Sequence, residues 1–62
     1  MKVSEMRAVA DACATSAGVW LSYAETSQTE EGTLAYATQS LASIQIANYW
    51  RESANDIERS YE

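Results

Sequence analysis

The chain has 62 residues, a net charge of −5, one cysteine, and neither histidine nor proline. So short a chain buries only about 60% of the surface that its unfolded form exposes. The single cysteine and the lack of histidine exclude an intramolecular disulfide and a zinc site, the usual supports of small domains. The four basic residues are scattered, so neither nucleic acid nor an anionic membrane surface is expected as a partner.

The first half of the chain predicts a helix over about residues 4–25. Its apolar residues recur at alternating steps of three and four, which is the spacing of one helical face. They are Val3, Met6, Ala10, Cys13, Ala17, Trp20 and Ala24. Ser4 is the expected N-cap, and Glu5 suits the first turn of a helix.

A polar stretch, residues 25–32, interrupts this pattern and predicts a turn at about residues 26–29. Two residues compete to cap the next helix. Ser27 and Glu30 have the spacing of a capping box, whereas Thr29 is followed directly by two glutamates. A single uninterrupted helix in a long coiled coil is the alternative, because Gly32 alone does not force a break.

The second helix is predicted over about residues 29–60. Its apolar stripe has an average step slightly under 3.5 residues, so it can follow a partner with a left-handed twist. The stripe comprises Leu34, Ala37, Leu41, Ile44, Ala47, Trp50, Ala54, Ile57 and Tyr61.

Both predicted helices lack charge in their middles, over residues 12–24 and 32–50. Folding the chain at the turn sets these spans side by side. A lone hairpin hides one stripe of each helix, and solvent-facing helix surface usually carries charge. We therefore predict a single all-α domain, an antiparallel two-helix hairpin completed as a four-helix bundle by homodimerisation. The expected self-association residues are Met6, Ala10, Cys13, Ala17, Gly18, Trp20, Leu34, Leu41, Ile44 and Trp50.

Two of these residues have further interpretations. Cys13 lacks a basic neighbour that would activate a thiol, so we interpret it as a small core residue; a redox role or an intermolecular disulfide is the alternative. Gly18 costs about 1 kcal/mol in a helix relative to alanine. We expect that it allows close packing.

The second helix is longer than the first, so its C-terminal end is expected to extend past its neighbour. Ile57 and Tyr61 continue the apolar stripe there, and aromatic residues are common anchors of interfaces. A surface for a protein partner is therefore predicted at this end. It consists of Tyr49, Ile57, Tyr61, Asp56 and Glu58.

The sequence contains no histidine base, phosphate-binding loop or nucleophile–base pair, so we expect neither an enzyme nor a bound cofactor or metal. The uncharged span 32–50 is too polar to cross a bilayer. A free thiol without a recognisable targeting segment favours the cytoplasm.

The leading hypothesis is a small protein-interaction module that binds and modulates a larger protein. Short acidic hairpins of this kind are common among accessory proteins of bacteriophages and mobile elements, which act on host factors. A structural subunit whose self-association is its function is the first alternative. The second is an acidic mimic of nucleic acid that inhibits a DNA- or RNA-binding protein. Its acids would be Glu52, Asp56, Glu58 and Glu62.

Overall fold

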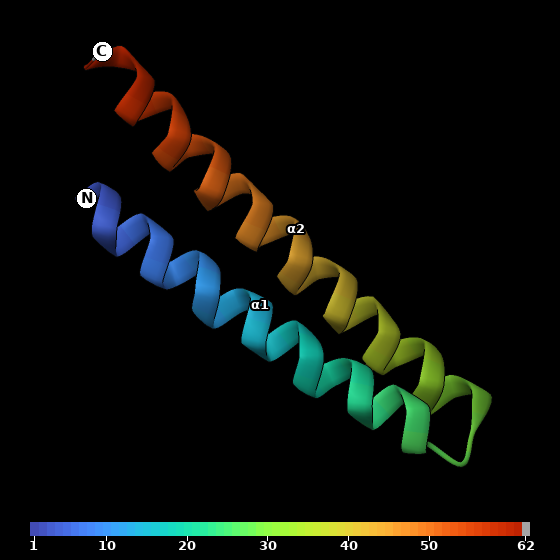
Figure 1. Cartoon of the computed structure of the whole chain (residues 1–62). Coiled ribbons are helices and arrows are strands. Elements are labelled where there is room, and N and C mark those ends of the chain that lie inside the picture. The colour runs from blue at the N-terminus through green and yellow to red at the C-terminus, as the bar shows by residue number, and fades with distance from the viewer. Residues whose placement is uncertain (62) are drawn as a thin grey trace.

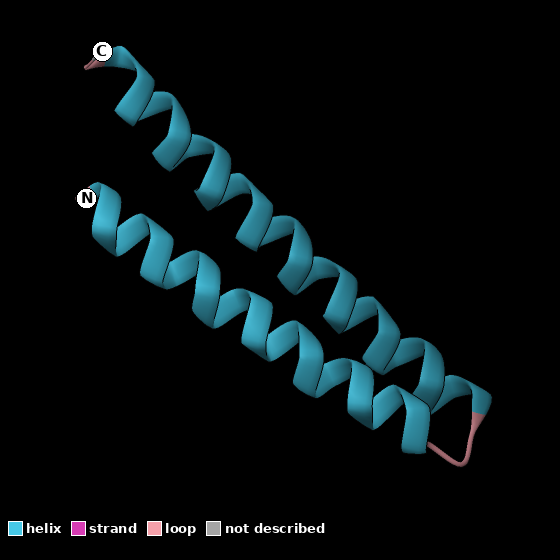
Figure 2. Cartoon of the chain, in the orientation of Figure 1, coloured by secondary structure: helices cyan, strands magenta, loops and turns pink. Residues whose placement is uncertain are grey.

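The computed structural model describes residues 1–61, which form two helices joined by a short turn (Figures 1 and 2). Helix α1 spans Val3–Thr26 and helix α2 spans Glu30–Ser60. They run antiparallel, with both chain ends at the end opposite the turn (Figure 1). The chain is therefore an antiparallel helical hairpin and not one continuous helix. Each helix begins and ends within one residue of the range predicted for it.

The start of α1 differs from the expectation. Lys2 is the N-cap residue, with extended backbone at φ −76° and ψ 153°, and its side chain makes no capping hydrogen bond. The Met6 N–H donates to the Lys2 carbonyl at 3.0 Å, so the helix has already begun before Ser4. The prediction that Ser4 caps this helix is wrong, because Ser4 lies inside the first turn. Glu5 lies in that turn, as expected.

The turn is closed by hydroxyl groups. Thr29 is the N-cap of α2, and its hydroxyl accepts a hydrogen bond from the Gly32 N–H at 3.0 Å. The Ser27 hydroxyl bonds both the carbonyl and the N–H of Thr29, at 3.2 Å and 3.4 Å. A Cβ at Gly32 would clash with the Ser27 hydroxyl and would lie 2.9 Å from Thr29 Oγ1. Thr29 is thus the cap, and glycine fits beneath it because the two hydroxyls fill that space.

The helices meet along a line of small residues spaced seven apart. Ala10, Ala17 and Ala24 of α1 are buried, as are Ala47 and Ala54 of α2. Ser40, seven residues before Ala47, donates from its hydroxyl to the Ala17 carbonyl at 2.8 Å. We call Ala10, Ala17, Ala24, Ser40, Ala47 and Ala54 the alanine seam. Seven-residue spacing keeps such a seam between two helices that twist around each other with a left-handed supercoil.

The predicted stripe of the second helix is only partly directed at α1. Ala47 and Ala54 face α1, but Leu34 is 70% exposed and Leu41 is 59% exposed. Leu41 follows Ser40, and successive helical residues point about 100° apart. Because the smaller Ser40 and Ala47 face α1, the leucines lie on the flank of α2.

The cap at Thr29 yields a stability prediction. Replacing Thr29 by Ala leaves the Gly32 N–H without its acceptor, and loss of such a cap costs about 1 kcal/mol. Chemical denaturation at fixed protein concentration measures this cost. Thr15→Ala is the matched control, because the Thr15 hydroxyl bonds the Asp11 carbonyl of its own helix and caps nothing. Equal stabilities of the two variants would show that the Thr29 cap contributes nothing.

Candidate protein-interaction surfaces

The hairpin leaves its large apolar side chains exposed. Within residues 1–61 no large side chain is fully buried, and the buried set is five alanines and Met6. Solvent reaches a substantial part of eleven larger residues. They are Met1, Val19, Leu21, Tyr23, Leu34, Tyr36, Leu41, Ile44, Ile46, Tyr49 and Tyr61. Side chains of this kind normally lie inside a core or an interface.

One broad side of the hairpin is marked by a cluster of three aromatic rings. Trp20 stacks on Tyr36 with ring centroids 5.7 Å apart, and Tyr23 lies 6.0 Å from Trp20 and 5.6 Å from Tyr36. These contacts bridge α1 and α2 near the turn.

Helical spacing extends this side along both helices. Residues seven apart lie on nearly the same face of a helix. Cys13 lies seven residues before Trp20, and Val9 fourteen before Tyr23. Trp50 and Ile57 follow Tyr36 by fourteen and twenty-one residues, and Ile46 lies one turn before Trp50. We call Val9, Cys13, Trp20, Tyr23, Tyr36, Ile46, Trp50 and Ile57 the aromatic face.

The opposite broad side is marked by ion pairs at the open end of the hairpin, which is the end where both chain termini lie (Figure 1). Arg7 donates to Asn55 at 3.0 Å and to Glu58 at 2.6 Å, and Arg51 bonds Asp11 at 3.3 Å. Their side chains are 42–76% exposed, so each ion pair contributes only about 0.2–1 kcal/mol.

Apolar residues continue this second side towards the turn. Leu21 lies fourteen residues after Arg7, and Leu34 and Leu41 lie twenty-one and fourteen before Asn55. Ile44 lies seven before Arg51. We call Leu21, Leu34, Leu41 and Ile44 the leucine face. It is apolar only in the half of the hairpin that is nearer the turn.

The residues predicted for self-association lie in different parts of the hairpin. Met6, Ala10 and Ala17 are buried between the two helices of one chain. Cys13, Trp20 and Trp50 lie half-buried on the aromatic face, whereas Leu34, Leu41 and Ile44 lie on the leucine face. Gly18 is exposed, and a Cβ there would meet nothing within 4 Å, so nothing in the hairpin packs closely against it.

The residues predicted for partner binding differ in how far solvent reaches them. Tyr49 and Tyr61 are 62% and 86% exposed, and the Tyr49 ring lies edge-on to Trp50 with centroids 5.2 Å apart. Ile57 is half-buried, so its side chain is less exposed than those of the two tyrosines.

The acids of that predicted surface already have partners within the chain. Glu58 pairs with Arg7, and Asp56 pairs with Arg59. Arginines therefore interrupt the anionic surface at the open end. Glu62, the last of the four acids expected in a nucleic-acid mimic, lies outside the described residues.

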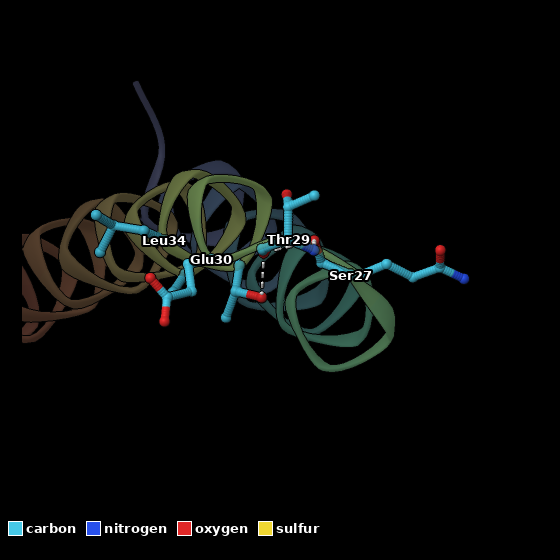
Figure 3. A pocket seen from close by; sticks show the side chains of 7 residues that line it. Ser27, Thr29, Glu30 and Leu34 are labelled. Carbon is cyan, nitrogen blue, oxygen red and sulfur yellow. Dashed lines mark hydrogen bonds between the residues drawn. The ribbon is translucent and has the colours of Figure 1, made fainter.

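A shallow, open hollow lies beside the turn. It is lined by Ser27, Gln28, Thr29, Glu30, Thr33, Leu34 and Ala37. Figure 3 shows Leu34 and Glu30 extending to one side of α2 while Ser27 and Thr29 lie at the turn. The hydroxyls of Ser27, Thr29 and Thr33 all take part in local hydrogen bonds of the cap. Apart from these hydroxyls, the lining offers a ligand the Leu34 side chain, the Glu30 carboxylate and the Gln28 amide.

Within residues 1–61, no three side chains among His, Cys, Asp and Glu come together in a way that could hold a metal ion. Cys13 is a free, half-buried thiol. Neither α1 nor α2 has a stretch long and apolar enough to cross a membrane.

No family model, curated protein or solved structure matches the chain. Sequence reasoning missed five members of the two faces, which are Val9, Leu21, Tyr23, Tyr36 and Ile46. On α2 a signal was present, because residues 36, 39, 43, 46, 50, 53 and 57 follow alternating steps of three and four, but the polar members Gln39, Ser43 and Ser53 obscured it.

Replacing Gly18 by alanine tests whether a second chain packs against this part of α1. In the hairpin alone, Gly18→Ala should raise the free energy of unfolding by about 0.5–1 kcal/mol, because alanine favours helix and the space is open. Denaturant titration of both proteins at matched concentration measures the change. A loss of stability would instead show that another chain approaches the backbone closely at Gly18.

Proposed function

We propose that the chain is a non-enzymatic protein-interaction module, which forms a homodimeric four-helix bundle and, as that dimer, binds and modulates a larger protein. The observation that carries the proposal is the exposure of its large apolar side chains around a seam of alanines. A hairpin with this distribution has a core of little more than alanines, and it can offer another chain the aromatic face and the leucine face.

The energetics favour a partner chain. Fully burying one large aliphatic or aromatic side chain contributes about 1.5–3 kcal/mol, and an alanine contributes far less. A domain of this length without disulfide or metal is marginally stable unless such burial is available. Covering even three or four of the exposed residues would therefore stabilise the helices more than the alanine seam does.

Two broad faces allow two kinds of partner. A second copy laid on one face completes a four-helix bundle, with the uncharged middles of all four helices together. The other face, together with the exposed Tyr49 and Tyr61, then remains for the larger protein. Tyrosine is among the residues that contribute most to binding at such surfaces.

A structural subunit is the second candidate, and the position of the two faces favours it. The aromatic and leucine faces lie on opposite sides of one thin hairpin, whose Cα trace measures 50 × 14 × 13 Å. Self-association through both faces would stack hairpins without limit. Electron microscopy distinguishes the candidates: filaments or sheets would support a structural subunit, and a closed particle would support the interaction module.

The proposed function predicts that stability depends on protein concentration. If the folded state is completed by another copy, raising the concentration 100-fold adds about 2.7 kcal/mol, and the midpoint of thermal unfolding should rise by on the order of 10 °C. Circular dichroism at several concentrations measures this. A midpoint that stays constant over the whole range would mean that the hairpin folds alone, and the dimer proposal would fail.

A further inference from the structure

We propose that the second copy covers the aromatic face in the antiparallel sense, with the turn of each hairpin lying over the open end of the other. The inference rests on the proposed homodimer and adds to it which face pairs and in which direction. It follows from the distribution of side-chain volume and charge along the hairpin.

The aromatic face is suited to a second copy over its full length. Its stripes run through residues 9, 13, 16, 20 and 23 of α1 and through residues 36, 39, 43, 46, 50, 53 and 57 of α2, and none of these residues is charged. The Cα dimensions of 50 Å by 14 Å give one broad side about 700 Å², close to the roughly 800 Å² per partner of a stable interface.

The leucine face does not offer the same length. It gives way towards the open end to Arg7, Asp11, Arg51 and Glu58, which form ion pairs across the helices. A second copy covering that end would have to remove these charges from water, and the desolvation penalty of buried ion pairs often exceeds their attraction. The aromatic face is therefore the one that a copy can cover from end to end.

Side-chain volume selects the direction of pairing. On the aromatic face, α1 carries the smaller Val9 and Cys13 towards the open end and the larger Trp20 and Tyr23 towards the turn. In the antiparallel dimer, a two-fold axis lies between the two hairpins and runs perpendicular to their helices. It places α1 opposite α1 of the second copy, so that the large residues of one copy face the small residues of the other. A parallel pairing would instead bring both clusters of Trp20, Tyr23 and Tyr36 to one end. Close packing with the two hairpins evenly spaced along their length requires large residues opposite small ones, and therefore the antiparallel arrangement.

The face is tested with two matched substitutions on α2. Ile46→Asp places a charge on the aromatic face and Leu41→Asp places one on the leucine face; the two residues are 49% and 59% exposed in the hairpin, so neither change disturbs its seam. Light scattering is expected to show at least a 100-fold weaker dimer for Ile46→Asp and an unchanged dimer for Leu41→Asp. Circular dichroism checks that Leu41→Asp remains helical. The opposite pattern, or equal effects, would overturn the choice of face.

The direction is tested by the distance between the two turns. A spin label is attached at Gln28→Cys in a Cys13→Ala background, after light scattering has given the mass of the labelled protein. Pulsed electron resonance is expected to give a separation near the hairpin length of 50 Å.

The possible results separate the two proposals. A dimer with labels within about 20 Å would overturn the antiparallel arrangement but leave the homodimer in place, because helices in a bundle lie 8–10 Å apart. If both the labelled protein and the unsubstituted chain are monomeric, the homodimer and this inference fail together.

Discussion

Alanine or serine at every seventh position of the seam determines how closely α1 and α2 approach each other. The Ser40 hydroxyl reaches the backbone carbonyl of Ala17 at 2.8 Å, a contact between side chain and backbone across the helices that a bulky neighbour would prevent. Because the seam is filled by small residues, there is no space between the helices for Leu34, Leu41 or Ile46. These side chains must lie on the broad faces.

The exposed faces, and with them the proposed function, follow from this constraint. A hairpin with leucine or isoleucine in its seam would hide its apolar bulk and present polar faces to water. Here the arrangement is reversed: small residues lie inside and aromatic and aliphatic residues lie outside. Exposed apolar area of this kind, on both sides of a molecule only two helices thick, is typical of a chain that is completed by other chains.

The sequence was sufficient to predict the two helices and their turn. The uninterrupted three–four spacing and the polar stretch at residues 25–32 defined these elements, and Thr29 was among the two residues expected to cap α2. The rotation of α2 about its own axis could not be predicted in the same way. Apolar residues cover so much of its circumference that periodicity alone does not distinguish the stripe through Leu41 from that through Ser40 and Ala47. Packing decides between them, since the smaller stripe allows closer contact.

The most direct measurement is the mass of the unsubstituted protein in solution, determined by light scattering across a dilution series into the low micromolar range. We predict twice the chain mass of 6.8 kDa, maintained on dilution, because a second copy would cover the aromatic face. A mass of 6.8 kDa at every concentration, with helical content unchanged, would contradict it: the alanine seam alone would then be sufficient to hold the hairpin together.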